Sequence, residues 1–140
     1  MVLSDKLFPH DISAEESVIG SLLLDGMSFT KIASFLEPEH FYLEPNKIIF
    51  EIARDLFNRQ EPINQITIAH ELETQEKLEE VGGRAYLAKV VDVVPTSIHI
   101  KHYANLVRRT ATMRTLINAA ENISDIGFDN DPDVETSLSK

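Results

Sequence analysis

The chain has 140 residues, of which 43% are hydrophobic and 26% are charged, and this is the size and composition of a single globular domain. The absence of cysteine excludes disulfides and thiolate-bound metals, and no apolar run is long enough to span a bilayer. The formal net charge of -10 disfavours direct binding of nucleic acid, because domains that grip phosphate backbones are usually basic.

The N-terminal segment MVLSDKLFPHD lacks the basic region and long apolar run of a signal peptide, so we expect a cytoplasmic protein. The first helix is predicted to open with a capping box, in which the Ser13 hydroxyl accepts a hydrogen bond from the amide of Glu16. Asp25-Gly26 is expected to end this helix. A second, shorter helix is predicted over residues 28–36, where apolar residues fall at helical spacing. They are Phe29, Ile32, Ala33 and Leu36.

Two further helices are predicted in the middle of the chain. One starts near Pro45, because proline is tolerated in the first turn of a helix, and it presents a wide apolar face. Its apolar residues are Ile48, Ile49, Ile52, Leu56 and Phe57. The next helix runs to Leu72, and Asn64 is its expected cap.

Two adjacent glycines in the stretch LEEVGGRAYL, residues 78–87, raise the question of a phosphate cradle. A Walker loop needs the pattern G-x-x-x-x-G-K-[ST] after a strand, and a dinucleotide site needs G-x-G-x-x-G. The sequence has neither pattern. We therefore interpret Gly82 as the left-handed end of a short helical turn and Gly83 as a point of close backbone approach. Another helix is predicted from this point to Pro95.

A long helix is predicted from Thr96 or Ser97 to Gly127, a length of about 45 Å at the α-helical rise. Apolar residues recur along it at alternating spacings of three and four, which is typical of a seam that packs on a partner helix or subunit. The expected association face comprises Tyr103, Leu106, Val107, Thr110, Met113 and Ile117. The expected polar contacts with a neighbouring domain come from Arg108, Arg109 and Arg114.

The residues after the long helix predict the turn of a helical hairpin whose second arm is cut at Lys140. Asp129, Asp131 and Asp133 have the alternating spacing with which a calcium loop begins. However, Val134 stands where such a loop requires glycine, and Lys140 stands where it requires glutamate. We therefore expect these acidic residues to cap the next helix and to keep the turn solvated.

The predicted fold is all-α. It has a compact multi-helix globular head over residues 1–95, followed by residues 96–140, which form a long helix and begin a helical hairpin. No recognisable nucleophile or acid–base pair is present, and the glutamates are expected to be solvated. His99 and His102 share a helix face but lack a third metal ligand. We therefore predict no catalytic, cofactor-binding or metal site, and a domain that serves association.

Three stretches of the sequence carry a resemblance to a known family. They are PHDISAEESVIGSLLLD from Pro9, FYLEPNKIIFEIARDLFNRQEPIN from Phe41, and the run from Thr67 that contains LEEVGGRAYL and PTSIHIKHYA. In this order they resemble the N-terminal domain of the bacterial replicative DNA helicase, DnaB. The resemblance extends from Pro9 to about Asp133, and therefore covers nearly the whole chain.

The resemblance implies a helical head and a hairpin that pairs domains into dimers, with three dimers forming the collar of a hexameric ring. It also implies that primase docks on the collar, and a helicase loader is a further candidate partner. In the family, a separate RecA-like domain binds ATP and Mg, contacts single-stranded DNA and unwinds the duplex. That domain lies outside this sequence, so we expect no enzymatic activity from the chain itself. Two other interpretations stay open: the helicase-binding domain of primase, and a helical module that binds nucleic acid.

Overall fold

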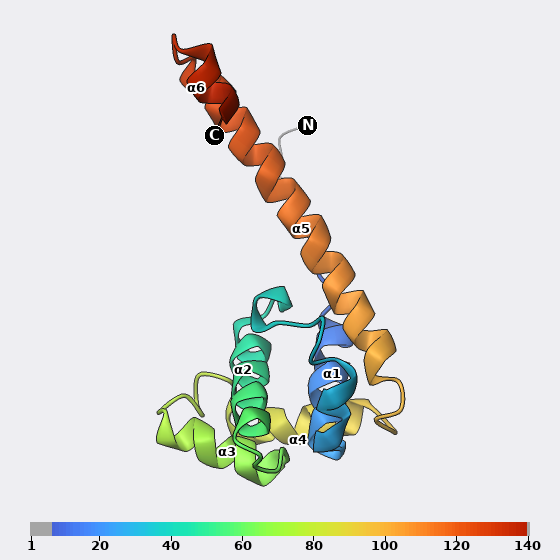
Figure 1. The fold of residues 1–140 in the computed structure, drawn as a ribbon. Coiled ribbons are helices and arrows are strands. Elements are labelled where there is room, and N and C mark those ends of the chain that lie inside the picture. Colours follow the sequence, from blue (N-terminus) through green and yellow to red (C-terminus); the bar gives the residue numbers. More distant parts are fainter. Residues whose placement is uncertain (1–6, 140) are drawn as a thin grey trace.

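A computed structural model describes residues 7–139, and within this range every regular element is helical (Figure 1). A head of short helices packs around the start of one long helix, α5, which then projects away from the head (Figure 1). This is the predicted all-α arrangement. The elements are α1 (Ile12–Leu24), the 3-10 helices η2 (Gly26–Lys31) and η3 (Pro38–His40), α2 (Glu44–Asn58), α3 (Gln65–Thr74), α4 (Gly83–Val93), α5 (Ile100–Asp129) and α6 (Val134–Ser139).

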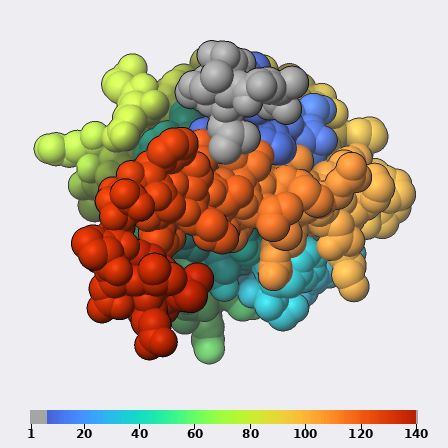
Figure 2. Space-filling model, turned by 90° about the horizontal axis from the view of Figure 1, so that it is seen from above, coloured from blue at the N-terminus to red at the C-terminus, as the bar shows by residue number. Residues whose placement is uncertain are grey.

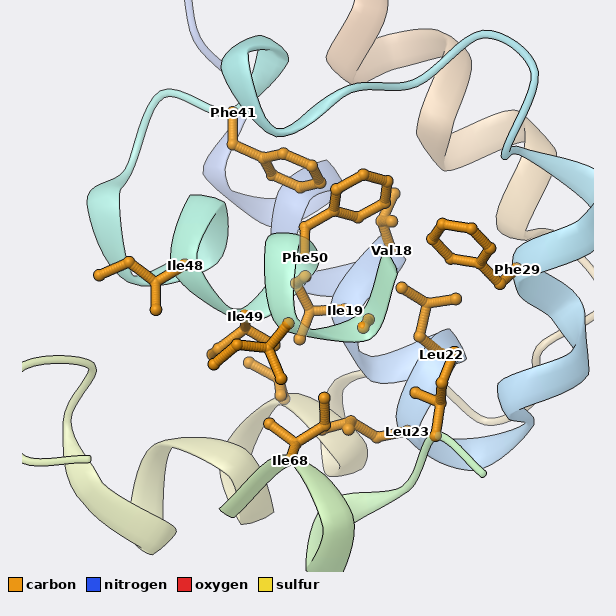
Figure 3. Close-up of a cluster of buried hydrophobic side chains, with 14 of the residues drawn as sticks. Val18, Ile19, Leu22, Leu23, Phe29, Phe41, Ile48, Ile49, Phe50 and Ile68 are labelled. Carbon is orange, nitrogen blue, oxygen red and sulfur yellow. The ribbon is translucent and has the colours of Figure 1, made fainter. Parts of the chain in front are cut away.

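The core of the head is built around α1, which is buried over most of its length and contacts both α4 and α5. Figure 3 shows Val18 and Ile19 of α1 near Phe50 of α2, and Phe29 of η2 in the same cluster. The ring centroids of Phe29 and Phe50 lie 5.6 Å apart. Gly20 permits the close crossing of α1 and α4, because a Cβ atom there would lie only 2.1 Å from the Val90 carbonyl oxygen.

The start of α1 differs from the predicted capping box. The N-cap is Asp11, whose carboxylate accepts a hydrogen bond from the Ala14 amide at 2.9 Å. Ser13 is already the second residue of the helix, so it does not cap. Glu16 contacts α4, where its Oε2 atom lies 3.4 Å from Lys89 Nζ. The prediction was wrong because two capping residues stand two positions apart, and the helix uses the earlier one.

The predicted helix over residues 28–36 is shorter and tighter in the structure. It is the 3-10 helix η2, and turns follow it. Asp25 caps η2 through its side chain, which accepts from the Met27 amide at 3.2 Å. Ala33 lies in the turns that follow η2 and is exposed, although it was predicted to be buried. The other three predicted residues, Phe29, Ile32 and Leu36, are buried.

The remaining helices of the head follow the sequence pattern. Asn64 caps α3 as predicted, because its side chain accepts from the amides of Ile66 and Thr67 at 2.9 and 3.0 Å. Gly82 is left-handed, with a φ of 106°, as predicted. Gly83 does not serve a close approach, since no atom lies within 4 Å of its Cβ position. Its φ of 72° is the feature that requires glycine.

The long helix α5 begins at Ile100, a few residues later than predicted, and has 30 residues, or about 45 Å. Thr96 lies in the preceding turn, where its hydroxyl accepts from the Ile98 amide. The buried residues of α5 are Ile100, Ala104, Val107 and Ala111. The first turns of α5 thus belong to the core of the head, although they follow the predicted boundary at 95/96, which itself stays a prediction. Asn130 is left-handed and reverses the chain into α6.

Candidate interaction surfaces

The environment of α5 changes along its length. Ala111 is its last buried residue, and beyond it large apolar side chains are open to solvent. We define the distal apolar surface as Met113, Leu116, Ile123 and Phe128 of α5, together with Val134 and Leu138 of α6, and these side chains are between 44% and 86% exposed. An apolar surface of this kind on a projecting helix is typical of a protein interface.

The predicted association face is divided by this change. Val107 is fully buried within the head of its own chain, so it is not available to a second chain. Tyr103 and Leu106 are partly buried and pack against the same core. Thr110 donates its hydroxyl to the Val107 carbonyl at 3.0 Å. Met113 is exposed and Ile117 is partly buried. Their role in association stays a prediction, whereas Val107 is a core residue.

The tip of the projecting helix carries an open groove between α5 and α6. Its volume is about 550 Å³, and its lining includes Ile123 and Ile126 of α5 and Val134 and Leu138 of α6. In Figure 2 the end of α5 and α6, coloured orange to red, lie in front of the head, on the face seen from above. Half of the distal apolar surface therefore lines this groove. Met113 and Leu116 lie along α5 between the groove and the head, and Phe128 lies near the far end of α5.

Two of the three predicted arginines make contacts inside the chain. The Arg108 guanidinium donates to the Phe35 carbonyl. The Arg114 guanidinium donates to the carbonyls of Pro9 at 2.9 Å and His40 at 2.7 Å. These contacts hold α5 to the head, and contacts of the two arginines with a neighbouring domain stay a prediction. Arg109 is exposed, and its role stays a prediction.

The Arg114 guanidinium also lies against an aromatic pair. Its central carbon is 5.5 Å from the centroid of the Tyr42 ring, and the His10 ring stacks on Tyr42 with a centroid distance of 4.4 Å. Such cation–π contacts are worth about 0.5–1 kcal/mol at exposed sites. Three separate parts of the chain therefore meet at this point: the segment before α1, the segment before α2, and the middle of α5.

His40 helps to fix the segment to which Arg114 binds. Its Nδ1 atom accepts a hydrogen bond from the Glu37 amide at 2.9 Å, which closes the capping box of η3. Burial lowers the pKa of the His40 imidazole, and the charge of Arg108 lowers it further. The lowered pKa agrees with the hydrogen bond, because a ring nitrogen can accept only when it carries no proton.

A buried carboxylate joins α1 to α2. Glu15 has no exposed surface, and its oxygens accept from the amides of Tyr42 at 2.7 Å and Leu43 at 3.2 Å. Asn46, which is also fully buried, donates its side-chain amide to Glu15 at 3.1 Å. Leu43 is the N-cap of α2 and has no capping side chain, so Glu15 supplies the negative charge at this helix start. The expectation that the glutamates are solvated is therefore wrong for Glu15.

The network extends from Asn46 to α4. The Tyr86 hydroxyl donates to the Asn46 side-chain oxygen. Burial raises the pKa of Tyr86 to about 12, the negative charge of Glu16 adds to the rise, and the hydrogen bond to Asn46 opposes it. Glu16 Oε2 is buried without a hydrogen-bond partner among the described residues, so its contact with Lys89 is purely ionic. Glu15, Asn46 and Tyr86 thus connect three helices through polar groups.

Within residues 7–139, no three His, Asp or Glu side chains are grouped as metal ligands, and His99 and His102 are both exposed. None of the helices in this range is both long and apolar enough to cross a bilayer.

Comparison with known proteins identifies the family. A family model described as the DnaB-like helicase N-terminal domain matches residues 7–109. The chain belongs to this family. The match excludes the alternative assignment to the primase side, because the matching family is that of the helicase.

Relatives and solved structures agree with the assignment to the DnaB-like family. The chain is 32% identical over 137 residues to the replicative DNA helicase DnaB of Geobacillus stearothermophilus, a match that covers 98% of this chain and 30% of the relative. It is 34% identical to the replicative DNA helicase DnaC of Bacillus subtilis, covering 99% of this chain and 31% of that protein. The chain therefore spans about a third of the length of these relatives.

Two solved structures show the same fold as this DnaB-like domain. The N-terminal domain of DnaB helicase from Mycobacterium tuberculosis is 31% identical and superposes with a TM-score of 0.84, covering 87% of this chain and 88% of that chain. A DnaB-like replicative helicase, studied together with its interactions with primase, is 25% identical with a TM-score of 0.77. The superposition covers 92% of this chain and 30% of that helicase.

The motifs by which the sequence resembles the DnaB family now have a structural meaning. Pro9 and His10 of the first stretch contact Arg114 and Tyr42, and Glu15 of the same stretch binds the start of α2. Tyr86, from the stretch with two glycines, donates to Asn46. These residues of the motifs therefore hold the helices of the head together.

Proposed function

We propose that this DnaB-like domain is the assembly region of a replicative DNA helicase, which associates with further copies of itself and provides a docking platform for primase. The distal apolar surface carries this proposal, because it leaves large apolar side chains exposed on a helix that extends beyond the head. The names of the relatives support the helicase context, and the primase interactions described for one similar helicase support the docking role.

The proposal assigns the chemistry of the helicase to residues outside this chain. The chain spans about a third of its relatives and has no phosphate-binding loop in its sequence. ATP, Mg and single-stranded DNA would be bound by the remaining part of the parent protein, which unwinds the duplex in the cytoplasm. A helicase loader is a further candidate partner. On this proposal the isolated chain hydrolyses no ATP, and measurable turnover by the purified chain would contradict it.

Self-association is tested by placing a charge on the distal apolar surface. Leu116→Asp puts a carboxylate on a side chain that is 66% exposed and makes no core contact, so the head should stay folded. Asn118→Asp adds the same charge at an exposed site on the opposite side of α5 and is the matched control. We expect sedimentation equilibrium to show weaker association for Leu116→Asp and wild-type association for Asn118→Asp, with equal helical content by circular dichroism.

Primase docking is tested separately, by titrating the C-terminal domain of a primase into the wild-type chain and both variants. Binding to the wild-type chain supports the docking role. An unchanged mass for Leu116→Asp at every concentration would refute the distal apolar surface as the association surface, and absence of primase binding to the associated wild-type chain would refute the docking role. Each role can therefore fail without the other.

A further inference from the structure

Arg114 lies where α5 leaves the head. Ala111, one turn earlier, is the last buried residue of the helix, so packing against the core ends there. At Arg114 the guanidinium spans two main-chain carbonyls, those of Pro9 and His40, and lies over the Tyr42 ring. The two carbonyls belong to segments that are 105 and 74 residues away in the sequence.

We propose that Arg114 is a positioning residue, whose bridge between the carbonyls of Pro9 and His40 sets the direction of distal α5 relative to the head. Because every residue of the distal apolar surface except Met113 lies beyond Arg114 in the chain, the bridge also sets where this surface is presented. The consequence for assembly rests on the proposed function. The direction of the helix does not, and it can be measured on its own.

The contacts around the bridge are fixed on both sides. His40 ends η3, where the Phe41 amide donates to Pro38 and the His40 amide donates to Glu37. The acceptor on this side is therefore held by a closed turn. Pro9 lies just before Asp11, the residue that caps α1, so the second acceptor is tied to the start of the most buried helix. Two hydrogen bonds from one planar group restrict its rotation more than a single hydrogen bond does.

The part of the helix beyond the bridge acts as a lever. Ser124 lies ten residues beyond Arg114, or about 15 Å along the axis. If α5 pivots by about 20° at Arg114, a group at Ser124 moves by about 5 Å. The Arg108 guanidinium also contacts the head, at the Phe35 carbonyl, but this contact lies before the pivot and does not hold the lever.

The direction of the lever can be measured by pulsed electron paramagnetic resonance between two spin labels. The chain has no cysteine, so Glu51→Cys on the head and Ser124→Cys on distal α5 give two unique labelling sites, both exposed. Dilution with an excess of unlabelled chain leaves only distances within one molecule. We compare the labelled chain with labelled forms that carry Arg114→Ala, Arg114→Lys or Arg109→Ala. Arg109 is exposed on the same helix and is the matched control.

We expect Arg114→Ala to broaden the distance distribution by about 5 Å, corresponding to the pivot above, while helical content stays unchanged. Arg114→Lys keeps the charge but offers one ammonium in place of a planar fork, so we expect it to broaden the distribution as well. Arg109→Ala should give the distribution of the unsubstituted chain.

A distribution for Arg114→Ala as narrow as that of the unsubstituted chain would overturn the proposal. If Arg114→Ala loses helical content, Arg114→Lys decides: a narrow distribution then shows that one contact suffices and overturns the bridge. Broadening by Arg109→Ala as large as that by Arg114→Ala would also overturn it, because the effect would not be specific. The association assay on Leu116→Asp has no influence on these distances, so failure of the proposed function and failure of the bridge are distinguishable.

Discussion

The buried carboxylate of Glu15 makes a sharp prediction about stability. In Glu15→Gln the size of the side chain is kept, but one of its two oxygens becomes an NH2 group, which cannot accept a hydrogen bond. Glu15 Oε2 accepts from Tyr42 alone, whereas Oε1 accepts from both Leu43 and Asn46. The less costly orientation therefore points the new NH2 group at the Tyr42 amide, which then loses its partner.

The expected cost follows from these contacts. A buried donor left without an acceptor costs about 1–3 kcal/mol, and loss of a negative charge at a helix N-terminus costs about 0.3–1 kcal/mol. We therefore expect Glu15→Gln to lower the free energy of unfolding by about 1–4 kcal/mol. In urea, where the slope is about 1–3 kcal/mol per molar, this corresponds to a midpoint lower by about 1 M.

Equilibrium unfolding in urea, followed by circular dichroism, measures this difference. Glu51→Gln is the matched control, because Glu51 lies on α2 but is exposed, and it should change the free energy of unfolding by less than about 0.5 kcal/mol. If Glu15→Gln were as stable as Glu51→Gln, the carboxylate would not be stabilising the start of α2, and the role assigned to it would be wrong.

Three further predictions concern the core, a tyrosine and a helix cap. Val107→Ala should destabilise the domain by about 1–3 kcal/mol in urea unfolding, whereas Met113→Ala should cost less than about 0.5 kcal/mol; equal costs would contradict their different burial. In an ultraviolet titration, one of the three tyrosines should ionise near pH 12, and this ionisation should be missing in Tyr86→Phe. Because the unfolded chain loses this proton near pH 10, the contribution of Tyr86 to stability should be lost between about pH 10 and 12. Ionisation of Tyr86 itself near pH 10 would exclude the raised pKa. Asp11→Ala should lower the free energy of unfolding by about 1 kcal/mol, whereas Ser13→Ala should have little effect. A larger loss of stability for Ser13→Ala than for Asp11→Ala would show that Ser13 caps the helix after all.

Local features of the fold could be predicted from the sequence because they depend on neighbouring residues. Asn64 caps α3 through amides two and three residues ahead, so the whole interaction lies within one short stretch. Gly82 is left-handed for a similarly local reason. Where two local signals compete, the sequence does not decide between them: Asp11 and Ser13 are both good caps, and only the packed helix shows which one is used.

The contacts that define the interaction surfaces could not be predicted in the same way. Glu15 binds amides 27 and 28 residues away, and Arg114 binds carbonyls 74 and 105 residues away. The sequence shows that a residue is polar, and helical periodicity shows on which helix face it lies. Neither shows which distant backbone group the residue will meet. The same limit applies to Val107, whose apolar character fitted a seam between chains as well as the core of its own head.

The bridge formed by Arg114 depends on the side chain of only one of its three residues. Both acceptors are main-chain oxygens, which every amino acid provides, whereas the donor is a single side chain. Substitutions of Pro9 or His40 that keep the local backbone would leave the bridge in place, but few residues other than arginine can span two carbonyls. In a mutational scan, tolerance at positions 9 and 40 should therefore be decided by turn geometry, and tolerance at position 114 by the guanidinium itself.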